Sequence, residues 1–103
     1  MITLKQLRQR RDKFIAILNT TKPDWKGQID KSRLDMSYCE DCILGQLYGR
    51  YTYGMLDLEL NNEQAVEYAL QIEKAYTPLL SDIEEERLLK EYDKLTKVWK
   101  EVL

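Results

Sequence analysis

The chain contains no histidine. Histidine is the commonest general base and metal ligand in proteins, and it is the usual partner of a serine or cysteine nucleophile. The glycine-rich phosphate-binding patterns G-x-G-x-x-G and G-x-x-x-x-G-K are also missing. We therefore expect a protein that is not an enzyme, with no catalytic residues, no cofactor and no metal. The eighteen acidic residues leave carboxylate-based acid–base chemistry as the alternative.

Long apolar runs are absent as well. No run approaches the ~20 apolar residues of a membrane span, and the first residues lack the apolar core of a secretory signal. Of the 103 residues, 44% are hydrophobic, which is enough for one compact core. We expect a single domain over residues 1–103, in a reducing cytoplasm and without membrane association.

Only two cysteines are present, Cys39 and Cys42, in a C-x-x-C spacing. A structural zinc needs four ligands, and this chain supplies two thiols and no histidine. A redox dithiol would be expected in a βαβ context, which the surrounding sequence does not predict. We expect packing cysteines. The alternatives are a reactive pair, with Cys39 in a first helical turn, or a zinc shared between two chains.

Charge is distributed unevenly. Residues 1–33 hold nine Lys/Arg and three Asp/Glu, whereas residues 34–103 hold seven and fifteen. A basic arm can contact nucleic acid, in which case the phosphate-binding residues would be Lys5, Arg8, Arg10 and Lys13. The favoured interpretation is that the basic helix packs beside acidic parts of its own chain, because the pI of about 5.2 is low for a nucleic-acid-binding domain.

The N-terminal segment from Thr3 to Asn19 shows helical periodicity, with a capping box formed by Thr3 and Gln6. Arg11 interrupts its apolar stripe. Its guanidinium can extend to the edge of the helix, or it can point inward and meet a carboxylate. For the inward case we expect Asp35 or Asp57 as the partner.

Two further helices are predicted in the second half. One begins at Asn61 or Asn62 and continues to about Thr77, where Pro78 would stop it. The other follows a capping box at Ser81–Glu84 and runs nearly to the end. Its inner stripe has a 4-3-4-3 spacing and consists of Leu88, Tyr92, Leu95, Trp99 and Val102. Glu101 falls in the opposite, solvated set. The fold prediction is an all-α, single-domain bundle of about four helices.

The central stretch, residues 34–54, holds both cysteines and three of the four glycines. A capping-box pattern at Ser37 predicts a helix from Tyr38 to Tyr48, with Gly49 after its end. Gly45 would then lie inside a helix, where it is unfavourable, so we expect another helix to cross there. Residues 51–60 alternate like a strand, but a short helix or turn is favoured because no second strand is predicted.

Four side chains cluster around Gly49 and Gly54. They are Tyr48, Arg50, Tyr51 and Tyr53. Tyrosine and arginine are enriched in the energetically dominant positions of binding interfaces, and both can stack on bases. These four residues form the predicted binding site. The alternative is that two of the tyrosines fill the core and Arg50 is merely solvated.

The sequence C-I-L-G-Q-L-Y-G at residues 42–49 carries a resemblance. Matching residues around it are Trp25, Ile29, Asp30, Leu34, Asp35, Tyr51, Gly54, Leu95, Thr96 and Trp99. In these positions the chain resembles small uncharacterised proteins of Gram-positive bacteria, especially actinobacteria, and their phages, which share a C-x-L-G-Q-L-Y-G core motif. Cys39 and the basic N-terminal helix lie outside the resemblance.

The resemblance implies a phage or mobile-element setting and no activity. Small acidic proteins in that setting often bind a host protein, including defence nucleases. We therefore expect a non-enzymatic protein-binding module, an inhibitor or accessory factor that acts on an unidentified host protein in the host cytoplasm. Nucleic-acid binding through the basic helix is the alternative function, and formation of homo-oligomers is left open.

Overall fold

The computed structural model describes residues 2–72 and 82–103. Within these residues it contains helices and no strand, which confirms the predicted all-α fold. The described helices are α1 (Leu4–Thr21), α2 (Trp25–Gln28), α3 (Ile43–Tyr48), α4 (Tyr51–Asp57), α5 (Asn62–Glu67) and α6 (Asp82–Lys100). Only α1, α4 and α6 have seven or more residues, so the described chain has more and shorter helices than expected.

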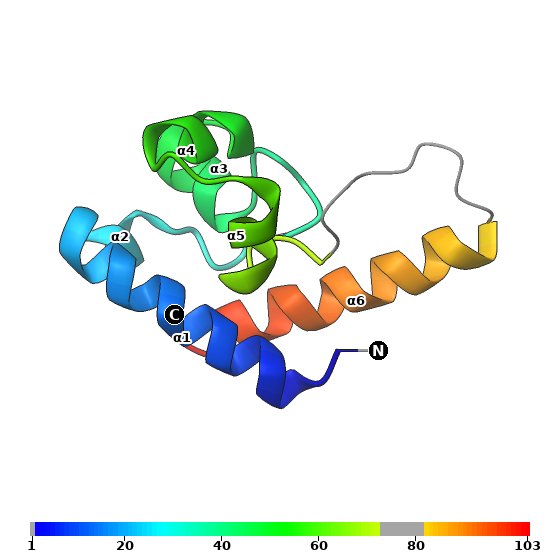
Figure 1. The fold of residues 1–103 in the computed structure, drawn as a ribbon. Helices are drawn as coiled ribbons and strands as arrows, with labels where there is room; N and C mark the ends of the chain where they lie inside the picture. The colour runs from blue at the N-terminus through cyan, green and yellow to red at the C-terminus, as the bar shows by residue number, and fades with distance from the viewer. Residues whose placement is uncertain (1, 73–81) are drawn as a thin grey trace.

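The helices form two layers (Figure 1). The two long helices, α1 and α6, lie side by side in one layer, and the short helices α3, α4 and α5 form a compact group on the other. The short α2 lies beyond the end of α1 and also contacts α3. The first part of α6 extends away from the other labelled helices.

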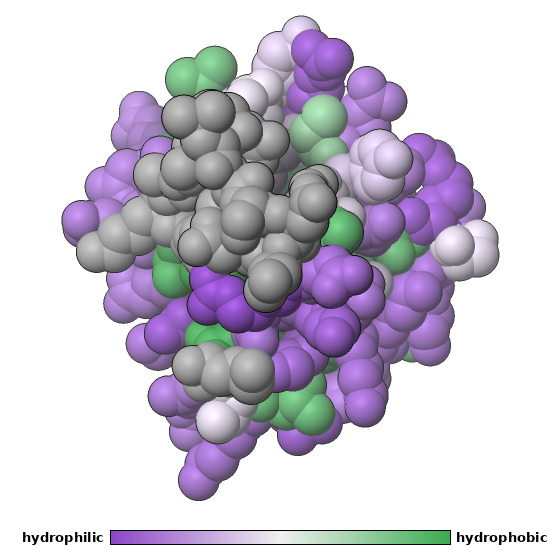
Figure 2. Space-filling model, turned by 90° about the vertical axis from the view of Figure 1, so that its right-hand side faces the viewer, coloured by the Kyte–Doolittle hydropathy of each residue, from purple (hydrophilic) through white to green (hydrophobic). Residues whose placement is uncertain are grey.

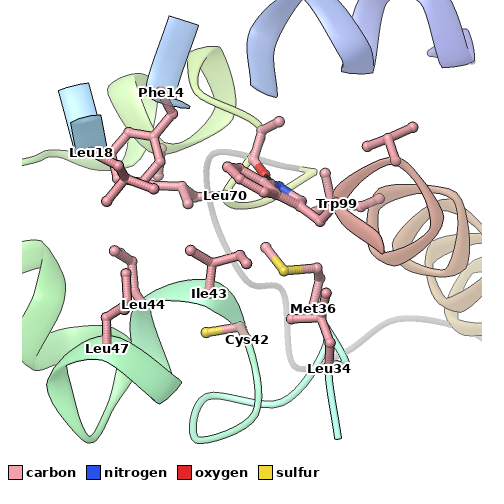
Figure 3. Packing of buried hydrophobic residues seen from close by; sticks show 14 of the residues in the cluster. Phe14, Leu18, Leu34, Met36, Cys42, Ile43, Leu44, Leu47, Leu70 and Trp99 are labelled. Carbon is pink, nitrogen blue, oxygen red and sulfur yellow. Dashed lines mark hydrogen bonds between the residues drawn. The ribbon is translucent and has the colours of Figure 1, made fainter. Parts of the chain in front are cut away.

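The core fills the space between these layers (Figure 3). Trp99 of α6 is fully buried at its centre, and its ring meets Phe14 and Trp25 edge-to-face, at centroid distances of 6.3 and 6.1 Å. The indole N–H donates to the carbonyl of Ala69 at 2.7 Å, so this buried polar group is paired. Ile43 faces the same core from α3. Trp25, from the short α2 (Trp25–Gln28), is itself buried and belongs to the same core.

The first helix follows its sequence signals. Thr3 accepts a hydrogen bond from the Gln6 N–H at 3.1 Å, and the Gln6 side chain accepts from the Thr3 N–H at 3.0 Å, which confirms the capping box. The helix ends at Thr21, just before Pro23, because the residue that precedes a proline is disfavoured in helix.

The helix predicted from Tyr38 is wrong at its start, because α3 begins only at Ile43. Ser37 does not cap a helix: its N–H and hydroxyl both donate to Asp35 Oδ1, at 2.9 and 2.6 Å. Asp35 thus holds the chain in a turn. The N-cap is Cys42, whose sulfur accepts from the Gly45 N–H at 3.2 Å. The end is as predicted, with Gly49 at φ 93°.

The helix predicted from Asn61 to Thr77 is also shorter than expected. Asn61 caps it with Gln64 in a capping box, but α5 ends at Glu67. Ala69 adopts φ 57°, the left-handed conformation that ends helices, and the Leu70 N–H returns to the Ala65 carbonyl at 2.8 Å. Tyr76, Pro78 and Ser81, the predicted N-cap of the last helix, lie outside the described residues.

Arg11 points inward, but neither predicted partner contacts it. Its guanidinium donates to the backbone carbonyl of Val98 at 2.6 Å, to Glu101 at 3.0 Å and to Asp12 at 2.9 Å. Arg8 binds the same Glu101 carboxylate through two nitrogens, at 3.0 and 2.7 Å. Asp35 and Asp57 are therefore wrong as partners, because α1 packs against the C-terminal end of α6 and brings Glu101 between the two arginines.

This arrangement predicts a pH dependence. Hydrogen bonds from Arg8, together with the charges of Arg8 and Arg11, lower the pKa of Glu101 from 4.5 to about 2. A lowered folded-state pKa stabilises the fold above about pH 4.5, and that contribution is lost as the pH falls toward 2. We expect the melting temperature of Glu101→Gln to depend less on pH than that of the wild type between these values. Parallel pH profiles would contradict this assignment.

Candidate functional site

The segment between α2 and α3 is held in place by polar contacts, although it has no regular structure. The Gln46 side chain accepts from the Asp30 N–H at 2.6 Å and donates to the Asp41 carbonyl at 3.0 Å. The Met36 N–H donates to the Thr96 hydroxyl of α6 at 2.9 Å. These contacts pair backbone groups of Asp30, Met36 and Asp41, although this segment has no helix to pair them.

Two glycines allow the segment and the short helices to approach closely. A Cβ on Gly45 would overlap the carbonyl oxygen of Cys39 and lie 2.6 Å from the carbonyl carbon of Glu40. A close approach was predicted at Gly45, but the element that approaches is this segment and not a helix. The helix crossing occurs at Gly54 of α4, where a Cβ would lie 2.9 Å from Leu44 Cβ of α3.

The two cysteines have different environments. Cys42 is buried, and burial raises the pKa of its thiol to about 11, so it is a neutral packing and capping group at pH 7. Cys39 is an exposed free thiol and not part of a helix, because α3 begins later than predicted. Among residues 2–72 and 82–103, no group of three His, Cys, Asp or Glu side chains could hold a metal ion.

The four predicted binding residues do not form one surface. Tyr51 is half-buried and donates its hydroxyl to Gln71 Oε1, and burial raises the pKa of this phenol. Tyr48 lies against Gly54, and the Lys22 ammonium lies 4.9 Å from its ring centroid. Burial, followed by the charge of Asp57, raises the pKa of Tyr48. These two tyrosines are packed within the chain.

Arg50 and Tyr53 are exposed instead. Arg50 precedes α4 and lies 3.8 Å from Glu40, and both side chains are more than half exposed. Tyr53 is 55% exposed on α4. Sequence reasoning missed Leu56, three residues further along the same helix and 76% exposed. It also missed Tyr38, which is 64% exposed in the segment that contacts the start of α4.

These exposed side chains belong to elements that are joined directly. The Tyr51 N–H donates to the Cys39 carbonyl at 2.7 Å, and Glu40 reaches Arg50 beside it. We call Arg50, Tyr53 and Leu56 the α4 surface. The face in Figure 2, by contrast, shows hydrophobic residues only as small, separate patches where described residues cover it.

The four basic residues of the alternative site are spread around α1. Arg8 is engaged by Glu101, and Lys13 lies 3.9 Å from Glu67. Arg8 and Arg10 are two residues apart, so they project about 160° from one another around the helix. Among the described residues, Lys5 and Arg10 have no ion-pair partner. The structure therefore does not bring the four cations together on one face.

A separate cavity of about 140 Å³ lies between the 36–42 segment, the start of α4 and α6. Its lining includes Tyr38, Tyr51 and Tyr92, together with Met36, Leu70 and Gln71. Among the described residues that line it, none carries a charge.

The described helices include none that is both long and apolar enough to cross a membrane. Comparison of the chain with protein-family models, curated proteins and solved structures finds no significant match.

Proposed function

We propose that this chain is a small, non-enzymatic protein-binding module that contacts its partner through the α4 surface. The observation that carries the proposal is the exposure of Tyr53 and Leu56 on one short helix, with Arg50 at its start. A single exposed apolar residue needs no explanation, but adjacent exposed aromatic and aliphatic side chains beside an arginine have the composition of an interface centre.

The contacts that hold α4 in place beneath this surface favour binding. Gly54 packs α4 tightly on Leu44 of α3, and the Tyr51 N–H fixes the start of α4 to the 36–42 segment. A rigid backbone loses little conformational entropy when a partner binds, so more of the contact energy appears as affinity. Arg50 has only a long, exposed ion pair with Glu40, which a partner's carboxylate can replace at small cost.

The proposed setting is a phage or mobile element, with a host protein as the partner and inhibition or modulation of that protein as the effect. Support for this part comes from the resemblance of residues 42–49 to small proteins of Gram-positive bacteria and their phages. The host cytoplasm is the corresponding compartment.

Nucleic-acid binding by α1 is the alternative function. It would rely on Lys5 and Arg10, because Arg8 is held by Glu101 and Lys13 lies near Glu67. Two cations on different sides of one helix would supply few phosphate contacts, and such contacts dominate nucleic-acid affinity.

Affinity capture from a Gram-positive host lysate tests both functions. We expect the wild-type chain to retain a specific protein, and Arg50→Ala/Tyr53→Ala to reduce its recovery at least about tenfold, since two residues at an interface centre each cost more than ~1 kcal/mol. The matched control is Lys90→Ala/Leu89→Ala, which removes an exposed cation and an exposed apolar side chain from α6. Tyr51 is not substituted, because its half-buried side chain also supports the fold.

The outcomes separate the two functions. Equal capture by both double variants would rule out the α4 surface. Capture that nuclease treatment abolishes, and that Lys5→Ala/Arg10→Ala weakens in a salt-dependent way, would support nucleic-acid binding instead.

A further inference from the structure

The tyrosine-lined cavity combines aromatic rings with a fixed geometry. Tyr51 donates its hydroxyl to Gln71, and the Tyr92 hydroxyl accepts from the Ile72 N–H at 3.4 Å. Burial, followed by the nearby Tyr92 phenol, raises the pKa of Tyr51. Both rings are therefore held by the chain itself, and Tyr38 is the exposed third aromatic side chain.

The chemistry of the described lining favours one class of ligand. An anion would need a cation or a set of free donors, and no Lys or Arg is among the described residues that line the cavity. A bare ammonium needs up to three hydrogen-bond acceptors, and one that lies here, Gln71 Oε1, already accepts from Tyr51. An ammonium whose hydrogens are replaced by methyl groups needs no acceptors and is attracted to the negative faces of aromatic rings.

We propose that this cavity binds a small organic cation with a methylated ammonium group, held by Tyr38, Tyr51 and Tyr92. The volume of about 140 Å³ is close to that of cavities that admit benzene, and it is below the ~300 Å³ of sites for drug-sized ligands. The cation is therefore a compact group, and not a long or multi-ring molecule.

The wider electrostatics are consistent with a positive ligand. The described residues that line the cavity all belong to the part of the chain from residue 34 onward, which carries fifteen Asp/Glu against seven Lys/Arg. A negative excess over this part of the chain favours the approach of cations over that of anions. The nearby Arg50 lies beside Glu40, which offsets part of its charge.

The test is an NMR titration with two probes of the same shape, choline and its uncharged analogue 3,3-dimethyl-1-butanol, at matched ionic strength. We expect choline to bind in the millimolar range and to shift the signals of Met36, Tyr51 and Tyr92. The alcohol should bind at least about threefold more weakly, because it lacks the cation–π attraction. Equal binding of the two probes would overturn the proposal and leave an ordinary apolar cavity.

Variants locate the site. Tyr38 is exposed, so Tyr38→Leu should fold normally and weaken choline binding at least about threefold, whereas Tyr38→Phe keeps the ring and should bind like the wild type. The control is Tyr53→Leu, an exposed tyrosine outside the cavity, which should not change the affinity. No shift up to about 100 mM choline, or equal binding by Tyr38→Leu and the wild type, would also overturn the proposal. The described lining of the cavity includes none of the three residues of the α4 surface. The choline titration is therefore independent of the proposed protein-binding function.

Discussion

Gly45→Ala is expected to destabilise the protein by about 1–3 kcal/mol, the usual cost of forcing extra atoms into a packed site. A Cβ at this position would overlap the Cys39 carbonyl oxygen and lie 2.8 Å from Glu40 Cα. These are backbone atoms, so no side-chain rotation can relieve the overlap. The same Cys39 carbonyl accepts the Tyr51 N–H, so moving it also weakens the contact that fixes α4.

Gly27→Ala is the matched control, because it makes the same chemical change in α2. Nothing lies within 4 Å of the added Cβ, and the unfolded chain loses conformational freedom. We expect Gly27→Ala to stabilise the protein by about 0.4–1 kcal/mol. Urea denaturation of both variants gives the two free energies of unfolding. A stabilising effect of Gly45→Ala would mean that the segment around Cys39 does not pack on α3 as described.

Sequence patterns predicted the helices best where cap and periodicity agreed. The predicted capping box at Thr3 is formed, Asn61 is the N-cap of α5 as one of its two predicted starts, and Gly49 adopts the positive φ that ends α3. A glycine is unfavourable inside a helix, and its presence at position 45 correctly indicated the close approach of another backbone segment. Each of these predictions depends on interactions within a few residues, which a single sequence displays directly.

The errors arose where a local signal lost to a competing contact. Ser37 has the right spacing for a capping box, but Asp35 lies two residues before it and takes its hydroxyl into a turn. α5 ends at Ala69 in the left-handed conformation, which alanine does not signal, and the Ala69 carbonyl accepts from Trp99, thirty residues away. Asp35 was a rival local partner for Ser37, whereas the contact between Ala69 and Trp99 could not be read from the residues near Ala69.

The candidate site was likewise predicted only in part. The cluster of tyrosines and Arg50 was visible in the sequence, but the sequence could not say which rings point inward. Tyr48 and Tyr51 are packed, whereas Arg50 and Tyr53 are exposed. Leu56 was missed because it fits an alternating pattern as well as a helical one. The cavity was not predicted, since it brings together residues from 36 to 92.

Arg11→Met is expected to cost about 2–3 kcal/mol, although methionine keeps the apolar part of the side chain. Val98 lies in the last turn of α6, and the Val102 N–H bonds to the Trp99 carbonyl instead of to that of Val98. Arg11 donates to the Val98 carbonyl at 2.6 Å in a buried position. The substitution leaves that carbonyl unpaired, which costs about 1–3 kcal/mol. It also removes a cation from a helix C-terminus, which costs about 0.3–1 kcal/mol.

Arg8→Met is the matched comparison, because Arg8 lies on the same helix and binds the same Glu101 carboxylate. Its side chain is 43% exposed, against 9% for Arg11, and no backbone carbonyl depends on it. We expect Arg8→Met to lower the free energy of unfolding by at most about 1 kcal/mol, and this loss should shrink at high salt because exposed pairs are screened. Thermal denaturation at low and high salt measures both effects.

A loss confined to Arg11→Met and insensitive to salt would show that Arg11 acts as the cap of α6. Equal losses in the two variants would mean that the Glu101 carboxylate, and not the Val98 carbonyl, fixes α1 to α6. An unchanged melting temperature for Arg11→Met would contradict both assignments and would return Arg11 to the cations available for an outside partner.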